Sequence, residues 1–130
     1  MANVLGLDHI QLAMPEGGET SARAFYGGIL GLTEIFKPAN LAKRGGVWFA
    51  CGALQLHLGV EHAFQPAKKA HPTLLVQDLK YFTSILEAQG FEIRSDDPLD
   101  GYERAFTSDP FGNRIELMER IAAATPSTTG

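Results

Sequence analysis

The chain has 130 residues, of which 45% are apolar, and it carries a formal net charge of −4. This length fits one ordinary domain or two very small ones, and the apolar content excludes global disorder. The excess of acidic residues excludes the basic footprint of a nucleic-acid-binding protein and a polybasic membrane patch. We therefore expect neither a nucleic acid nor a membrane as a partner.

Cysteine usage and the N-terminal residues bear on the compartment. Cys51 is the only cysteine and cannot form an internal disulfide, which indicates a reducing compartment. The first residues lack the charged and apolar regions of a signal peptide. The longest nearly apolar stretch, 45–54, is far shorter than the roughly 20 residues that span a bilayer. We expect a cytoplasmic protein.

In the first half, an alternating strand over 8–14 is followed by apolar residues at helical spacing over 22–30, which Gly31 closes. After a loop at 37–46, strands are expected at 47–51 and 54–58.

The second half repeats this order after a linker at 59–69. A strand is expected over 70–76, then a helix with Asp78 as its N-cap and Gly90 at its end. Strands at 104–108 and 114–119 follow, joined by a turn at 109–113.

The two halves have matching landmarks. His9 precedes Gln55 by 46 positions, and His71 precedes Glu116 by 45. We interpret this as a duplicated β-α-β-β(-β) unit, the alternative being chance similarity of two short amphipathic patterns. Each module is too small to bury a large core alone. We expect one domain over 1–130, with modules at about 4–62 and 68–120 and a frayed tail at 121–130, and a homodimer that covers exposed sheet edges.

Alternation places polar side chains on one face of the predicted strands. One interpretation is an ordinary half-buried sheet with a wet face. The other is a metal site, because imidazole and carboxylate groups bind divalent metals. The side chains on this face are those of His9, Gln11, Gln55, His57, His71, Thr73, Arg114 and Glu116.

Three segments resemble the vicinal oxygen chelate superfamily, which contains glyoxalase I, bleomycin-resistance proteins and extradiol dioxygenases. They are GLDHI at 6–10, FYGGILGL at 25–32 and DPFGNRIEL at 109–117. The resemblance covers about 4–120. It implies an α+β fold with two βαβββ modules, whose sheets curl into an open cup-like barrel with the helices on the outer face.

The resemblance also implies a ligand set for one divalent metal: Zn, Ni, Mn, Co or Fe. By position, His9, His71 and Glu116 match family ligands. The fourth position, a glutamate in glyoxalase I, holds Gln55, whose amide cannot accept a proton. Glyoxalase I activity is therefore not expected. His57 is a candidate base, with ligand and pocket-lining roles as alternatives.

The expected function is that of a metal-dependent enzyme acting on a small oxygen-chelating substrate, as a lyase, isomerase, thiol transferase or dioxygenase. Glu116 and His57 are its candidate catalytic residues. The alternative is a metal-free protein that sequesters a drug or small molecule, as bleomycin-resistance proteins do. Aromatic side chains and arginines are alternatively core residues or partners of acidic neighbours. The candidate substrate-binding residues are Trp48, Gln55, Tyr102, Arg104 and Arg114, and Phe49 and Phe106 are further candidates for an apolar lining.

Overall fold

A computed structural model describes residues 2–121 of the chain. The chain divides into two compact units, described over 2–66 and 67–121. Nearly all of the tail expected to fray lies outside the described residues. Over 2–121, no helix is long and apolar enough to cross a membrane.

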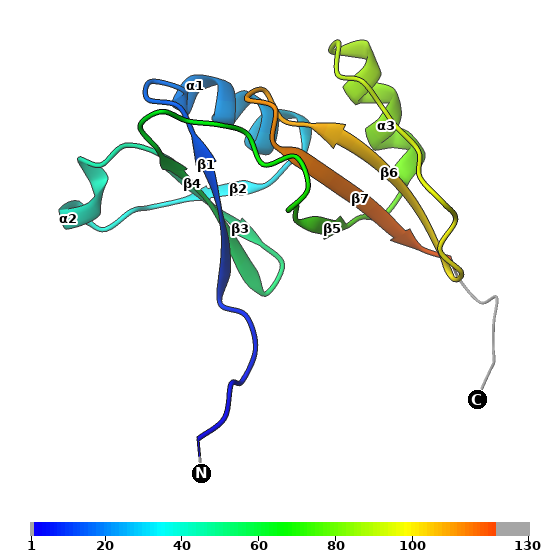
Figure 1. Ribbon diagram of the computed structural model, residues 1–130, viewed down its shortest axis with the longest axis horizontal. Coiled ribbons are helices and arrows are strands. Elements are labelled where there is room, and N and C mark those ends of the chain that lie inside the picture. Colours follow the sequence, from blue (N-terminus) through cyan, green and yellow to red (C-terminus); the bar gives the residue numbers. More distant parts are fainter. Residues whose placement is uncertain (1, 122–130) are drawn as a thin grey trace. The chain divides into compact units, whose positions relative to one another are not determined.

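The first unit is a four-stranded sheet with helical segments (Figure 1). The strand order is β1-β4-β3-β2, with β1 parallel to β4 and the other pairs antiparallel. In chain order the elements are β1 (His9–Met14), α1 (Glu19–Ala22), η1 (Arg23–Ile29), β2 (Thr33–Ile35), α2 (Ala39–Ala42), β3 (Val47–Cys51) and β4 (Leu54–Val60).

Alternation along the strands sends the apolar side chains to the face covered by α1 and η1. Phe25, Tyr26, Phe49 and Leu56 are buried there, and the Tyr26 and Phe49 ring centroids lie 5.8 Å apart. Phe49 therefore belongs to the core, the alternative to a pocket lining that the sequence left open.

The helix expected over 22–30 differs in its winding. The α-helix α1 ends at Ala22, and the rest of this segment, η1, is a π-helix. In it the Leu30 N–H donates to the Phe25 carbonyl, five residues earlier, at 2.9 Å. The wider turn keeps both Phe25 and Tyr26 buried.

The second unit is a three-stranded sheet with one helix, and the strand order over the described residues is β5-β7-β6. Figure 1 shows α3 lying along β6 and β7, and the buried Leu79 and Leu86 side chains belong to this helix. The Asp78 carboxylate caps it by accepting from the Tyr81 N–H at 3.2 Å, as predicted. Its elements are β5 (Thr73–Leu75), α3 (Leu79–Ala88), β6 (Tyr102–Ser108) and β7 (Arg114–Arg120).

The mixed α+β fold with two sheet modules is confirmed, and both units follow the same plan. In each, the first strand runs parallel to the last, which pairs antiparallel with the strand before it. The register differs from the sequence count, however. His9 pairs with Gln55, but Thr73 rather than His71 pairs with Glu116. β5 starts two residues after His71, so the expected strand at 70–76 is too long.

Asp109 and Asn113 hold the turn at 109–113 together through hydrogen bonds. The buried Asp109 carboxylate accepts from the backbone N–H groups of Phe111 and Asn113, each at 2.9 Å, and from the Asn113 side chain at 3.0 Å. The Asn113 side-chain oxygen accepts from the Ala67 N–H at 3.0 Å. These bonds fix the start of β7 and hence the position of Glu116.

Candidate functional site

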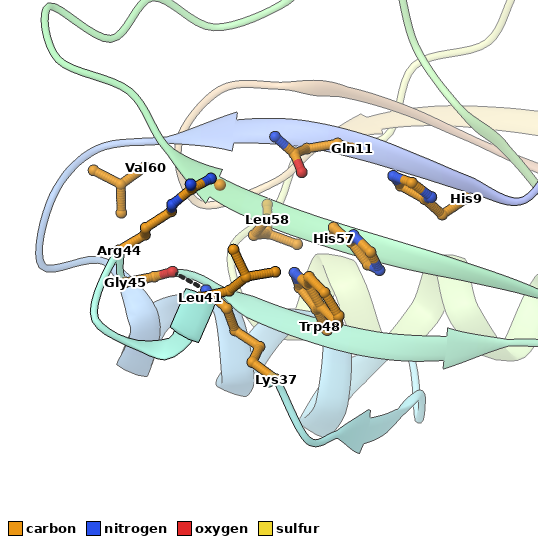
Figure 2. A pocket seen from close by; sticks show the side chains of 11 residues that line it. His9, Gln11, Lys37, Leu41, Arg44, Gly45, Trp48, His57, Leu58 and Val60 are labelled. Carbon is orange, nitrogen blue, oxygen red and sulfur yellow. Dashed lines mark hydrogen bonds between the residues drawn. The ribbon is translucent and has the colours of Figure 1, made fainter. Parts of the chain in front are cut away.

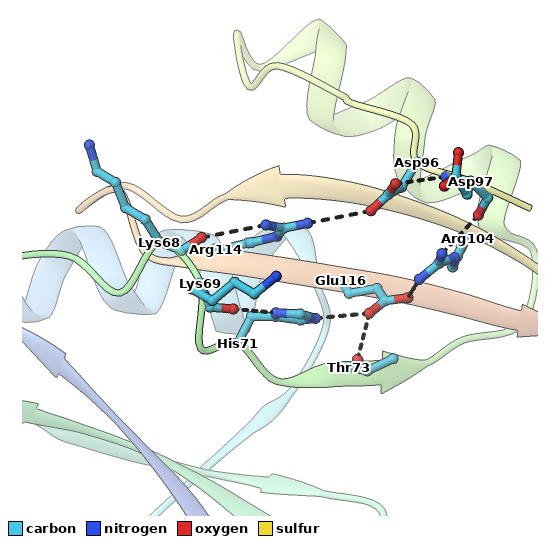
Figure 3. A network of polar contacts seen from close by, with 9 residues as sticks. All are labelled: Lys68, Lys69, His71, Thr73, Asp96, Asp97, Arg104, Arg114 and Glu116. Carbon is cyan, nitrogen blue, oxygen red and sulfur yellow. Dashed lines mark hydrogen bonds and ion pairs between the residues drawn. The ribbon is translucent and has the colours of Figure 1, made fainter. Parts of the chain in front are cut away.

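A buried carboxylate is the centre of the polar face in the second unit (Figure 3). Glu116 Oε1 lies 3.0 Å from His71 Nε2 and accepts from the Thr73 hydroxyl at 2.8 Å. Glu116 Oε2 accepts from Arg104 Nη1 at 3.1 Å, and Arg104 Nη2 donates to the Asp97 carbonyl at 2.8 Å. The carboxylate is thus held from three sides.

The pKa of Glu116 is the result of opposing influences. Burial raises this pKa. The hydrogen bonds with Thr73, His71 and Arg104 and the positive charge of Arg104 lower it by more, so the pKa of Glu116 lies below its usual 4.5. Glu116 is therefore a carboxylate at neutral pH.

His71 faces two acceptors. Its Nδ1 lies 2.9 Å from the Lys69 carbonyl oxygen, which only accepts, so Nδ1 carries a hydrogen. In the neutral ring this leaves a lone pair on Nε2, which faces the Glu116 carboxylate. Two lone pairs at this distance require either a proton on Nε2 or a bound cation.

A divalent metal fits this pair. Ligand atoms about 2.1 Å from a metal and at right angles to each other are about 3.0 Å apart. The observed separation of His71 Nε2 and Glu116 Oε1 is 3.0 Å. Histidine ligands also typically donate their other N–H to a carbonyl or carboxylate, as His71 does to Lys69.

His9 in the first unit also has an oxygen acceptor beside its Nδ1. Its Nδ1 lies 3.0 Å from the Asp8 carboxylate, and a hydrogen on Nδ1 leaves the lone pair on Nε2. In both histidines an oxygen acceptor thus lies within 3.0 Å of Nδ1, an arrangement that favours the tautomer of an Nε2 metal ligand. Within either unit, over residues 2–121, three or more His, Cys, Asp or Glu side chains do not gather into a metal-binding group.

His57 lies between two rings on the sheet of the first unit. Its ring stacks on Trp48 with centroids 3.9 Å apart and on His9 at 4.3 Å. Its Nε2 donates to the Gln55 side-chain oxygen at 2.8 Å. Gln55 is therefore a partner of His57, a role that its match to a metal-ligand position did not indicate.

Burial lowers the pKa of His57 below its usual 6.5, and the positive charges of His9 and Lys37 lower it further, against the opposing charge of Asp8. The neutral ring stabilises the folded chain fully above pH 6.5, and this contribution is lost as the pH falls through the lowered value.

The charge at Lys37 can be tested as a cause of this lowered pKa. In metal-depleted protein, we expect Lys37→Gln to raise the pKa of His57, because one repelling charge is removed. Titration of the imidazole carbon-bound protons by NMR measures it. Lys43→Gln removes an equal charge from the same loop and serves as the control. An equal rise in both variants would contradict the assignment to Lys37.

A pocket of about 400 Å³ opens beside this stack in the first unit (Figure 2). His9 and Gln11 of β1, Trp48 of β3 and His57 of β4 line it from the sheet. The segment around α2 contributes the opposite wall, with Lys37, Leu41 and Arg44. The loop at 37–46 therefore contains a short helix and shapes a cavity.

The remaining predicted substrate residues belong to the second unit. The Arg104 and Arg114 guanidinium groups lie 5.5 and 4.3 Å from the centroid of the Phe106 ring, which is buried below them. Tyr102 instead lies near Arg120, at 5.9 Å from its guanidinium, and no contact places it in the Glu116 network within the described residues.

Some site features had no usable sequence signal. The Lys69 carbonyl that orients His71 is a backbone group, so no residue type marks it. Asp8 precedes His9 directly, and a carboxylate next to a candidate ligand is a signal that could have been used.

The chain was compared with known proteins. The family model of the glyoxalase/bleomycin resistance protein/dioxygenase superfamily matches residues 6–117. No protein of curated function matches the sequence.

Among solved structures, a glyoxalase family protein from Bacillus anthracis is 48% identical, with a TM-score of 0.87, covering 93% of this chain and 99% of that one. A glyoxalase/dioxygenase from Nostoc punctiforme is 21% identical, with a TM-score of 0.73 and coverage of 93% and 99%. The fosfomycin resistance protein FosX from Listeria monocytogenes, complexed with Mn(II) and sulfate, is 19% identical, with a TM-score of 0.72 and coverage of 92% and 94%. The last two show likeness of fold alone. The family-model match and the 48% identity establish that this chain belongs to the glyoxalase/bleomycin resistance protein/dioxygenase superfamily.

Proposed function

We propose that the protein is a divalent-metal-dependent enzyme that acts on a small substrate with two neighbouring oxygen atoms. His9, His71 and Glu116 hold the metal. The observation that supports the proposal is the placement of His71 Nε2 3.0 Å from the Glu116 carboxylate, with His71 Nδ1 2.9 Å from the Lys69 carbonyl oxygen. His9 joins the set through its match to the family's ligand position and through the Asp8 carboxylate that lies 3.0 Å from its Nδ1.

The surrounding residues support these ligand roles. Thr73 and Arg104 hold the two oxygens of Glu116, which keeps the carboxylate ionised and fixes its orientation. Oε1, which also accepts from Thr73, is the Glu116 oxygen beside His71 Nε2, and it would be the oxygen that holds the metal. FosX, which shares the fold, is complexed with Mn(II) in its solved structure. The proposed metal is one of Zn, Ni, Mn, Co and Fe.

When bound, the metal supplies Lewis-acid stabilisation of negative charge that develops on the substrate oxygens. His57 is proposed as the base. Its Nε2 hydrogen is directed to Gln55, so the other nitrogen, Nδ1, is left to accept a proton. Trp48, stacked on the ring, keeps the imidazole in this orientation. Arg114 and Arg104 are proposed to contact the substrate on the second unit, and Trp48 and Gln55 on the first.

A homodimer is part of the proposal. β1 is an edge strand of its sheet, and the segment before it exposes Val4, Leu5 and Leu7 at 95%, 95% and 68%. Exposed strand edges beside apolar side chains are commonly covered by a second chain.

Elemental analysis of tag-free protein purified without chelators tests the metal. We expect about one equivalent of a divalent metal per chain, lost on chelation and regained on remetallation, and sedimentation of the same samples should give twice the chain mass. Absence of metal before and after remetallation would contradict the enzyme proposal and favour a metal-free binding protein.

A further inference from the structure

The pocket of the first unit presents two cationic side chains. Lys37 and Arg44 both line it, and among the eleven lining residues, all in the described part of the chain, there is no aspartate or glutamate. We propose that this pocket binds a small organic anion, with its carboxylate or phosphate-type group at Lys37 and Arg44. Its volume of about 400 Å³ falls within the usual range of small-molecule sites, about 300–1,000 Å³.

Neither cation is in direct contact with a carboxylate within the described residues. Over residues 2–121, neither Lys37 nor Arg44 forms an ion pair. Lys37 donates to the Gly45 carbonyl, which positions the ammonium but leaves its charge, and it lies 5.9 Å from the centroid of Trp48. Positive charge that is not directly paired in a concave site attracts anions.

Two acidic groups of the first unit have partners of their own. The Glu19 carboxylate accepts from the Gly46 N–H at 2.7 Å, which lowers its pKa, and the charge of Lys37 lowers this pKa further, but Glu19 does not line the pocket. The Glu34 carboxylate accepts from Arg23, with distances of 3.0 and 3.2 Å. Arg23 and Glu34 therefore pair with each other. Lys37 and Arg44 are available to a ligand in the pocket.

The rest of the pocket fits the uncharged part of such a ligand. Leu41 and the Trp48 indole provide apolar surface near Lys37 (Figure 2). The Gln11 amide, which lies over Gly59, offers polar hydrogen-bonding groups. At Gly59 a Cβ would lie 2.8 Å from Gln11 Nε2, so the absence of a side chain there makes room for the amide.

This inference rests on the proposed function and names its substrate class. His9 lines the same pocket, so a molecule anchored at Lys37 and Arg44 lies beside a proposed metal ligand. The anion group anchors the molecule, and another part of it would carry the reacting oxygens.

Trp48 provides a direct test because it is the only tryptophan and lines the pocket. Full-length protein, stripped of metal on a chelating resin, is titrated with hexanoate and with the uncharged hexanamide. We expect a saturable change of Trp48 fluorescence with hexanoate only, and calorimetry should give the same affinity. Competition by butylphosphonate distinguishes phosphate-type from carboxylate preference.

Lys37→Gln and Arg44→Gln should each weaken hexanoate binding about tenfold, since each removes one charge-assisted contact. Lys43→Gln is the matched control, because Lys43 lies in the same loop but does not line the pocket, and it should bind like wild type. Equal binding of hexanamide, an equal loss in Lys43→Gln, or no saturable binding would overturn the inference. Since the titration uses metal-free protein, its failure is separate from a failure of the metal analysis.

Discussion

Replacing His71 with alanine is expected to weaken divalent-metal binding by about a hundredfold or more, because a ligand and its preset tautomer are both lost. The His71 side chain is 24% exposed, so the fold should survive its truncation. Metal affinity is measured by competition with a chromogenic chelator, and circular dichroism confirms folding.

His62→Ala provides the control for this variant. His62 is an exposed histidine that neither lines the pocket nor belongs to the Glu116 network. It should keep wild-type metal affinity. If His71→Ala still bound one equivalent of metal as tightly as wild type, His71 would not be a ligand and the proposed site would be wrong.

Replacing Gly46 with alanine is expected to lower the free energy of unfolding by about 3 kcal/mol or more. Gly46 has φ of +85°, and a Cβ there would lie 2.1 Å from the Leu58 carbonyl oxygen. That oxygen belongs to β4, so backbone must move to relieve the overlap. Urea unfolding followed by Trp48 fluorescence measures the loss.

Gly52→Ala separates backbone strain from this overlap. Gly52 also has positive φ, +58°, but no atom lies within 4 Å of its Cβ position. It should lose only about 1–2 kcal/mol from the left-handed conformation. Equal losses in the two variants would mean that the close approach to Leu58 has no energetic effect. Because Gly46 ends the loop that carries Lys37 and Arg44, its variant should also weaken anion binding.

Local patterns predicted most of the fold. Alternating residues mark β3 and β4, whose bounds were expected within two residues, and Asp78 caps α3 as its residue type indicates. These features depend on the period of side chains along one segment. The strand β2 was not predicted, because three residues are too few to show a period.

Within the candidate site, the sequence singled out His71 and Glu116, and the structure brings them together at 3.0 Å. The exact pairing was not predicted, since two residues on one face of a sheet can meet directly or diagonally. Thr73 takes the directly paired position, and His71 reaches the carboxylate from before the strand.

Residue types and local periodicity were enough to predict the family, the two-module α+β plan and the candidate metal ligands. The partners of these residues became visible in the fold alone. There Gln55 contacts His57, oxygen acceptors lie beside Nδ1 of His9 and of His71, and Lys37 and Arg44 line one pocket. These outcomes depend on strand register and on the path of a loop, which bring together atoms that no local pattern relates.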